Sequence, residues 1–488
     1  MIQVIKSNKQ NIIIFIILFI LTLSLVYTST FNPFNLRIMN VDTSTYVTIV
    51  QGITRGQVLY RDLADNKGPI THFISVPGFY FGKITGLWIT EFIIIFIVFF
   101  FMYKTALLFV NYKTALITIC AISLAMHPFY IVHAGTEVYS LPFLIISLYI
   151  FTKYYINKKS ITLFEIFILG ICFSCSIMIR FNMFPLWAGF CFIIVIDCII
   201  NKKLLDLFKF ILIFICGIII VLLPIFLYFI YYNLFDYFYI QVILGGISRG
   251  FQISLLQQFI YNLYIVINRS LSFIPLLIGI IFLLIKYNNI NTFYYYGFIL
   301  SYILSIIFIS FSTGNSHYNL ILIPFFVPAL AFLSQILLNQ FSKYKHSILA
   351  VLFCFCIIFS EGIARLSFYL FTNFDSGQQL QYVGRLIDEL TEPDDEIISL
   401  GWNGYIYPFT SRSYASKYIY QSETFDHIPD AKWQFINDIL TKKPRLITIY
   451  TAGDNQFKKD WHEEIYALID KEYKLVSYDY GFDIYLRM

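Results

Sequence analysis

One hydrophilic stretch, residues 40–82, carries side chains well suited to chemistry. It lies between two long apolar runs and concentrates three carboxylates and three cations, namely Asp42, Arg55, Arg61, Asp62, Asp65 and Lys67. A carboxylate can act as a general base, and a cation stabilises the negative charge of a phosphate. Groups of both kinds at a membrane surface favour chemistry on a phosphate-bearing substrate.

Asp42 is the candidate catalytic base in this stretch. Four apolar or aromatic residues that follow it, Tyr46, Val47, Val50 and Ile53, recur at helical spacing, which predicts an amphipathic helix lying on the outer membrane face. The Asp42 carboxylate would then lie at the level of the lipid head groups, where it can take a proton from an acceptor hydroxyl. The segment Asp42-Thr-Ser-Thr is also a good helix start, so an N-cap role for Asp42 stays open.

The segment Leu59-Tyr-Arg-Asp-Leu-Ala-Asp-Asn-Lys-Gly-Pro holds the candidate substrate- and phosphate-binding residues of the loop. They are Arg61, Asp62, Asp65 and Lys67. A local ion pair, Arg61 with Asp65 or Asp62 with Lys67, is the alternative interpretation, and such a pair is worth little if it is exposed.

Glu137 is the second candidate catalytic acid and begins the apolar run at 138–152. A carboxylate at the mouth of an apolar helix is costly unless it is paired or lines a cavity, which favours a functional role. Stabilisation of the first helical turn by its negative charge is the alternative.

Two later segments add candidate phosphate ligands. His317 and Tyr318 precede the apolar run at 318–338 and offer imidazole and phenol donors. An interfacial aromatic belt explains them equally well. Arg249 lies in the turn Gly245-Gly-Ile-Ser-Arg-Gly, which can cradle a phosphate or simply reverse the chain.

These motifs together resemble the bacterial GT-C-type glycosyltransferases related to the protein O-mannosyltransferases and the aminoarabinose transferases of lipid A. Members of that superfamily have an acidic residue after the first span, then a G-x-x-Y-R-D-like turn and a K-P or K-G-P element. The corresponding residues are Asp42, then Gly56 to Asp62, then Lys67-Gly68-Pro69. Glu137 is similar to the family's second acidic element, and His317-Tyr318 to its H-Y element.

The resemblance implies an inverting transfer of one sugar at the outer face of the membrane. The donor would be a polyprenyl-phosphate sugar, and the acceptor a cell-envelope glycan, lipid or protein. Asp42 would be the base, and Lys67 would contact the donor phosphate with help from Arg61, His317 or Arg249. No cofactor is expected. Position 43 is a threonine where many relatives carry a second acid, which weakens the case for a divalent metal, although Asp42, Asp62, Asp65 and Glu137 are all possible ligands.

Composition indicates a polytopic α-helical membrane protein. The 488 residues are 58% hydrophobic and 13% charged, with a mean hydropathy of +0.72. Eleven apolar runs predict about eleven spans, at 11–28, 87–110, 114–131, 138–152, 161–179, 183–200, 207–232, 271–286, 293–311, 318–338 and 347–366. All eight cysteines fall inside apolar runs, so neither a disulfide framework nor a zinc site is indicated.

The lysines predict the orientation. They occupy every second connection, at Lys6, Lys9, Lys104, Lys113, Lys153, Lys158, Lys159, Lys202, Lys203, Lys286, Lys343 and Lys345. The positive-inside rule therefore places the N-terminus in the cytoplasm and the loop at 30–86 outside. Cations dispersed in short turns also argue against nucleic-acid binding.

Two domains are expected. Residues 1–372 form the GT-C-like transmembrane domain with its catalytic loop at 30–86, and residues 373–488 form a small extracytoplasmic α/β domain. In the second domain, helices are predicted at 376–390, 432–441 and 459–470, and strands at 397–400, 445–450, 473–478 and 482–486. A capping-box pattern at Ser376-Gly-Gln-Gln marks the start of its first helix.

Three other functions stay open. A transporter or flippase of lipid-linked saccharide would also have many spans and outer cations, but it would place its ionisable residues near the bilayer midplane. A polymerase of envelope polysaccharide is a second alternative. A membrane-anchored scaffold is a third, and it gives the loop at 30–86 no role.

Overall fold

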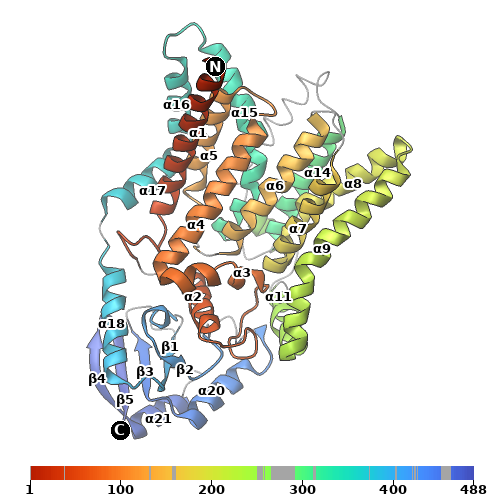
Figure 1. Ribbon diagram of the computed structural model, residues 1–488. Helices are drawn as coiled ribbons and strands as arrows, with labels where there is room; N and C mark the ends of the chain where they lie inside the picture. The colour runs from red at the N-terminus through yellow and green to blue at the C-terminus, as the bar shows by residue number, and fades with distance from the viewer. Residues whose placement is uncertain are drawn as a thin grey trace.

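The computed structural model combines a bundle of apolar helices with a small mixed sheet (Figure 1). It describes residues 2–37, 39–130, 133, 135–156, 161–249, 257, 259–264, 292–311, 315–372, 374–401, 404–419, 421, 425, 427–451 and 463–488. The predicted polytopic helical fold with a C-terminal α/β domain is confirmed.

The apolar runs form the helices of the bundle and the last helix of this region, which leads out of it. They are α1 (Ile2–Tyr27), α4 (Val76–Ala106), α5 (Tyr112–Met126), α6 (Thr136–Ile156), α7 (Leu163–Ile179), α8 (Pro185–Ile200), α9 (Leu204–Tyr232), α14 (Thr292–Ser310), α15 (Ile323–Gln340), α16 (Ser347–Ile358) and α17 (Ser360–Phe371). In lipid a helix satisfies every backbone polar group within itself, which is why such runs become helices.

Among the described residues, six helices are long and apolar enough to cross a membrane, or seven if the bent pair α16–α17 counts as one span. Helices α5, α7 and α8 are apolar but shorter. The predicted run at 271–286 lies outside the described residues, so the count of eleven spans stays a prediction. Helix α9 exposes much of its apolar surface, as expected for a helix that faces lipid.

The last predicted span, 347–366, is not one straight helix. Helices α16 and α17 meet at an 83° bend, and α17 leads away from the bundle toward the sheet (Figure 1). Helix α17 carries Glu361 and Arg365, which pair at 3.3 Å. Burying charged side chains in lipid costs free energy, so the chain bends where the apolar sequence gives way to polar residues.

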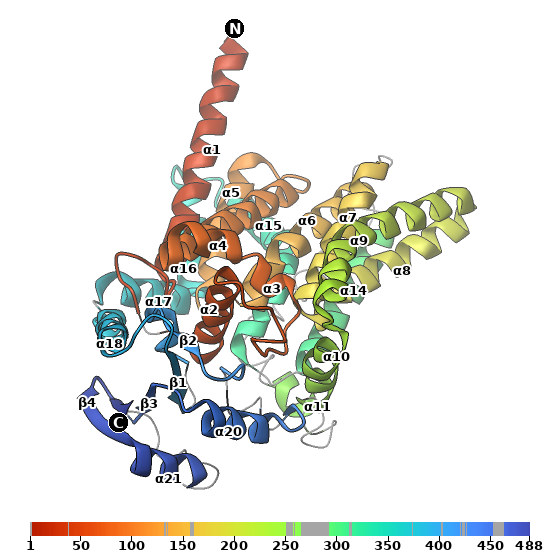
Figure 2. The same ribbon diagram turned by 60° about the horizontal axis from the view of Figure 1, so that its bottom comes forward.

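Helix α2 (Val41–Thr54) lies between the helical bundle and the sheet (Figures 1 and 2). The predicted helix is present, but the expectation that it exposes a polar face is wrong, and its position at the outer membrane face stays a prediction. Its residues from Thr43 to Gly52 are all buried, because the bundle covers one side of the helix and the soluble domain covers another.

The C-terminal α/β domain, which we call the soluble domain throughout, begins with α18 (Ser376–Leu390). Its strands are β1 (Glu396–Leu400), β2 (Ser413–Tyr414), β3 (Leu446–Tyr450), β4 (Tyr473–Asp479) and β5 (Phe482–Arg487). They form one sheet in the order β2-β1-β3-β5-β4. Strands β2, β1 and β3 are parallel, whereas β5 and β4 are antiparallel to their neighbours. Helices α20 (Ala431–Lys442) and α21 (Glu463–Glu472) complete the domain.

Most predicted elements of this domain are present, with two differences. Strand β2 has only two residues, too few for a sequence pattern. The N-cap of α18 is Asp375, and its side chain makes no capping hydrogen bond, so the start of the helix lies one residue before the predicted capping box.

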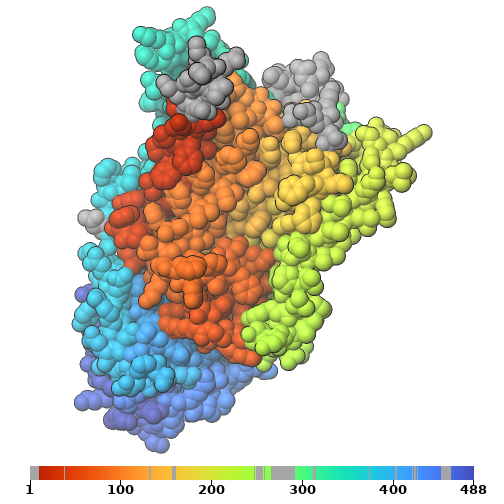
Figure 3. Space-filling view, in the orientation of Figure 1, coloured from red at the N-terminus to blue at the C-terminus, as the bar shows by residue number. Residues whose placement is uncertain are grey.

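Direct hydrogen bonds dock the soluble domain on α2. The Gln51 side chain donates to the Thr410 carbonyl at 3.0 Å and accepts from the Tyr414 hydroxyl at 2.6 Å. The 3₁₀ turn η4 (Tyr407–Phe409) packs on the same helix. In the space-filling view the soluble domain, coloured blue, directly abuts the orange-red surface of the first loop (Figure 3).

A short helical segment after α9 holds the first loop from another side. It comprises α10 (Phe235–Phe238), the π-helix η2 (Tyr239–Leu244) and α11 (Gly245–Arg249). The buried Gln241 side chain donates to the Tyr60 carbonyl at 2.7 Å and accepts from the Asp65 amide at 3.1 Å. The first loop is therefore fixed by packing rather than free in solvent.

Candidate functional site

The N-terminal end of α2 presents the Asp42 carboxylate. Asn40 is the N-cap residue, and its side-chain oxygen accepts a hydrogen bond from the Thr43 amide at 2.8 Å. The N-cap interpretation of Asp42 is therefore wrong, and its half-buried carboxylate is left for another role. The Thr43 hydroxyl donates to the His133 carbonyl at 2.9 Å, which anchors this end of α2 beside the start of α6.

Buried Tyr46, one turn further along α2, is acted on by the charges of side chains from separate parts of the chain. They are Asp42, Asp65, Glu137 and Arg180. Burial and the three carboxylate charges raise the pKa of Tyr46 well above its ordinary value, although Arg180 opposes them. The phenol is therefore a hydrogen-bond donor at physiological pH. We refer to Asp42, Tyr46, Lys67, Glu137, Arg180 and His317 as the α2 cluster.

Glu137 and Arg180 form a buried ion pair within the α2 cluster. Glu137 lies in the first turn of α6, and Arg180 directly follows α7. The Arg180 guanidinium donates to the Glu137 carboxylate and lies 4.1 Å from the centre of the Tyr318 ring. Burial alone would lower the pKa of Arg180, but Tyr318 and Glu137 raise it. The positive charge of Arg180 and the negative charge of Glu137 are thus held together where α6 begins and α7 ends.

The Lys67-Gly68-Pro69 element docks on the end of α7. A Cβ on Gly68 would lie 2.0 Å from the Met178 carbonyl oxygen, so only glycine permits this approach. The Gly68 amide and the Thr71 hydroxyl both donate to the Ile179 carbonyl, each at 3.2 Å. This contact places Lys67 beside the residue that precedes Arg180. The Lys67 ammonium donates to the Asn66 side chain at 2.8 Å.

Asp65 pairs with His72 rather than with a neighbouring cation. The two side chains meet at 2.7 Å, and the imidazole is buried. Burial alone would raise the pKa of Asp65, but the hydrogen bond and charge of His72 lower it. The pair joins the loop to α3 (Ile70–Phe73). Asp65 therefore helps to hold the loop in place.

His317 and Tyr318 lie on the same side of the bundle. They belong to the 3₁₀ helix η3 (Ser316–Leu322), and both are half-buried. The charges of Asp42, Lys67, Glu137 and Arg180 all act on the His317 imidazole. Both aromatic side chains therefore face the α2 cluster.

Arg61 and Asp62 lie in a different environment. They pair with each other at 2.8 Å, so neither of the predicted local pairs, Arg61 with Asp65 or Asp62 with Lys67, is the one formed. With Lys417 and Glu396 of the soluble domain they line a polar cavity of about 390 Å³. The structure thus groups them with the soluble domain.

Arg249 ends α11, whose Ser248 hydroxyl donates to the His427 carbonyl of the soluble domain at 3.2 Å. The Arg249 side chain lies outside what the structure describes.

Metal ligands were left open by the sequence. Within the described ranges, no three His, Cys, Asp or Glu side chains are grouped so that they could hold a metal ion. Asp42, Asp65 and Glu137 all act on Tyr46, whereas Asp62 pairs with Arg61. Metal dependence stays a matter for the assay proposed below.

The sequence prediction did not include Glu91, which lies inside α4 and is fully buried. Its carboxylate accepts hydrogen bonds from the Ser29 hydroxyl at 2.7 Å and the Tyr130 hydroxyl at 2.9 Å, and His133 lies 3.7 Å away. Burial, with the charge of Arg37, lowers the pKa of His133 well below its ordinary value. An acid inside an apolar run is itself a functional signal. Glu91 contacts His133, whose carbonyl accepts the hydrogen bond from Thr43 that anchors α2.

Comparison with known proteins gives matches at the level of structure. No protein-family model matches the chain, and no curated protein matches it in sequence. The crystal structure of ArnT from Cupriavidus metallidurans in the apo state aligns with a TM-score of 0.63 at 11% identity, covering 98% of both chains. The same protein bound to undecaprenyl phosphate aligns with a TM-score of 0.61 at 12% identity, covering 97% of both.

An archaeal oligosaccharyltransferase shares the fold over most of this chain. AglB from Archaeoglobus fulgidus, in complex with an inhibitory peptide and a dolichol-phosphate, aligns with a TM-score of 0.54 at 11% identity. The match covers 89% of this chain and 69% of that one. The chain therefore shares the fold of ArnT and AglB, the fold that the resemblance of its motifs implied.

Proposed function

We propose that this protein is an inverting membrane glycosyltransferase. In this proposal it moves one sugar from a polyprenyl-phosphate donor to a hydroxyl group of a cell-envelope glycan, lipid or protein. The α2 cluster is the observation that supports the proposal. The Asp42 carboxylate does not cap its helix, and its charge and those of Lys67 and Arg180 act on His317. The fold is shared with a protein crystallised with undecaprenyl phosphate.

Asp42 takes the proton of the acceptor hydroxyl in this mechanism. The acceptor oxygen forms a bond to the anomeric carbon of the sugar as the bond from that carbon to the phosphate oxygen breaks. The phosphate leaves with the electron pair, and attack from the opposite side inverts the anomeric configuration. The transition state carries oxocarbenium character on the sugar and growing negative charge on the phosphate.

Lys67 stabilises the leaving phosphate together with Arg180 and His317. Phosphate is a stable anion, so its departure requires positive charge more than a proton donor. Docking of Gly68 on α7 and the Glu137–Arg180 pair hold these cations in place before the substrate arrives. We assign Glu137 the role of positioning Arg180, rather than that of a second base.

A transfer assay tests the proposal. Purified protein in lipid vesicles is given radiolabelled polyprenyl-phosphate sugars and a membrane lipid extract as acceptor, with and without EDTA. Wild type is compared with Asp42→Asn and with the matched control Asp62→Asn, which removes a carboxylate from the cavity beside the soluble domain.

Label in a new product that requires Asp42 but not Asp62 would support the transferase, and loss of product in EDTA would show metal dependence. Donor binding without any product would contradict it, and movement of the labelled donor across the bilayer would then identify a flippase.

A further inference from the structure

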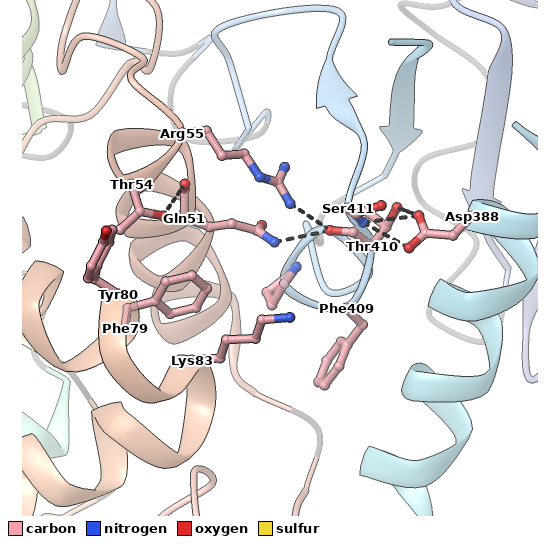
Figure 4. Close-up of a pocket in the computed structure, with 11 residues that line it drawn as sticks. Gln51, Thr54, Arg55, Phe79, Tyr80, Lys83, Asp388, Phe409, Thr410 and Ser411 are labelled. Carbon is pink, nitrogen blue, oxygen red and sulfur yellow. Dashed lines mark hydrogen bonds between the residues drawn. The ribbon is translucent and has the colours of Figure 1, made fainter. Parts of the chain in front are cut away.

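A second cavity lies at the other end of α2, between the bundle and the soluble domain (Figure 4). Its volume is about 360 Å³. The lining includes Gln51 and Arg55 from α2, Tyr80 and Lys83 from α4, and Asp388 and Thr410 from the soluble domain. None of these residues has a part in the proposed transfer chemistry.

Lys83 has an unusual backbone conformation. Its φ of 50° and ψ of −132° break α4, although a residue other than glycine rarely adopts positive φ. Close packing of the two parts of α4 accompanies the break, since a Cβ on Gly86 would lie 1.8 Å from the Gly78 carbonyl oxygen. The exposed Lys83 ammonium points toward the soluble-domain loop (Figure 4), and it has no partner among the described residues. Strain of this kind often marks a functional position.

Arg55 supplies a second cation from the C-terminal end of α2. Its guanidinium donates to the Arg412 carbonyl at 2.8 Å and to the Thr410 carbonyl at 3.0 Å. A guanidinium has five N–H donors, so these two bonds orient the group and leave others for a ligand.

The one carboxylate of the lining is already engaged. Asp388 accepts from the Thr410 hydroxyl at 2.6 Å and the Ser411 amide at 3.0 Å, and Arg412 lies 3.9 Å away. Its charge is therefore offset within the soluble domain, and the cavity presents the positive charge of Lys83 and Arg55. An anion is the complementary ligand.

Exposed aromatic rings beside this cavity are typical of a protein surface at the membrane interface. Tyr80 is 69% exposed and Phe81 is 85% exposed, next to the apolar length of α4. Aromatic rings at such a boundary lie among lipid head groups. Arg55 follows Asp42 by thirteen positions along α2, which is about 20 Å at the usual rise. A single phosphate cannot occupy this cavity and the α2 cluster together.

We propose that this cavity binds the phosphate of an anionic membrane lipid. Lys83 and Arg55 contact the phosphate, and the acyl chains extend along Tyr80 and Phe81 into the bilayer. Such a lipid touches the membrane domain and the soluble domain at once, and so joins them at the membrane surface. This inference is independent of the proposed glycosyl transfer.

Direct lipid binding tests the inference. Acyl-labelled phosphatidylglycerol is titrated into the purified full-length protein in detergent, with labelled phosphatidylcholine as the neutral probe and inorganic phosphate as competitor. The variants are Lys83→Asn, which tolerates positive φ but lacks the charge, Lys83→Arg, which keeps it, and Lys104→Gln as a control from the far end of α4.

Lys83→Asn should weaken phosphatidylglycerol binding about fivefold, the usual effect of one cation near a membrane surface. Phosphatidylcholine binding should not change, and Lys83→Arg and Lys104→Gln should resemble wild type. Equal phosphatidylglycerol binding by wild type and a folded Lys83→Asn protein, judged by an unchanged melting temperature, would overturn the proposal. Displacement of the lipid by inorganic phosphate alone would also overturn it, since it would indicate a site for free phosphate.

Discussion

The two ends of α2 carry similar residue types in very different surroundings. At the N-terminal end, Glu137 and Arg180 form a buried ion pair, and Asp65 pairs with His72. Beyond the C-terminal end, Arg61 and Asp62 pair in a partly exposed position, and Lys83 is exposed. Charges at the first end are fixed by packing, whereas those at the second are only weakly constrained.

This difference bears on what each end can do. Fixed charges in a water-poor site stabilise a transition state without having to reorganise. Exposed cations are screened by water and salt, which suits reversible binding at a membrane surface. Substitutions at the N-terminal end should therefore have large effects, and equivalent substitutions at the C-terminal end should have small ones.

Asp42→Asn should give the largest effect. Loss of the general base should reduce the rate of transfer by roughly 10²- to 10⁴-fold, with little change in stability because the amide nearly matches the carboxylate in shape. Initial rates and melting temperatures of the two proteins check this. A variant with wild-type turnover would contradict the assignment of Asp42 as the base.

Arg180→Gln should give the largest loss of stability. It leaves the Glu137 carboxylate buried without its cation, which typically costs about 3–5 kcal/mol. The double variant Glu137→Gln/Arg180→Gln should recover most of that stability but not the transfer rate, because the cation is still missing. Thermal unfolding of the two single variants and the double variant measures the coupling; additive effects would rule out a direct interaction.

Glu91→Leu should be moderately destabilising. It removes the acceptor of the Ser29 and Tyr130 hydroxyls, and an unsatisfied buried hydroxyl costs about 1–3 kcal/mol. Glu91→Gln keeps an acceptor oxygen and should lose less. If both variants melted at the wild-type temperature, the network would have no supporting role.

The Asp65–His72 pair should make stability depend on acidic pH. The pKa of Asp65 is lowered in the folded protein, so its contribution is present above the pKa of an unfolded aspartate, about 3.9. That contribution is lost as the pH falls through the lower, folded pKa. The difference in melting temperature between wild type and Asp65→Asn should therefore shrink from neutral pH toward pH 3, and a constant difference would exclude this linkage.

Arg61→Gln should give the smallest effect. Its pair with Asp62 is partly exposed, and such pairs contribute less than about 1 kcal/mol. Transfer rate and melting temperature should both stay near wild type. A loss of activity comparable with that of Asp42→Asn would place Arg61 in the transfer chemistry and contradict the contrast between the two ends of α2.

The helices and most strands could be predicted because their patterns are local. Long apolar runs specify membrane helices, and alternation of helix and strand signals specified the soluble domain. The bend between α16 and α17 and the two-residue strand β2 were missed, since neither has a periodic pattern of its own. The burial of α2 was missed because two distant segments cover it.

The candidate site was predicted in part. Motif spacing selected Asp42, Lys67, Glu137 and His317, and the charges of the first three act on the His317 imidazole together with that of Arg180. It also selected Arg61 and Asp62, which pair beside the soluble domain. Sequence neighbours in a loop can point to opposite sides, and only tertiary packing decides which side each one faces.

The sequence by itself determined that this chain is a polytopic membrane protein with an α/β tail and a charged first loop. Hydrophobicity and residue spacing are properties of the sequence alone, so they can be assessed without any knowledge of tertiary contacts. Tertiary structure decided which charges are paired, since Glu137 and Arg180 meet across 43 residues. It also docked Gly68 of the first loop on Met178 at the end of α7. The interaction energy of a charge depends on its neighbours and on its exposure to water, and the tertiary fold sets both.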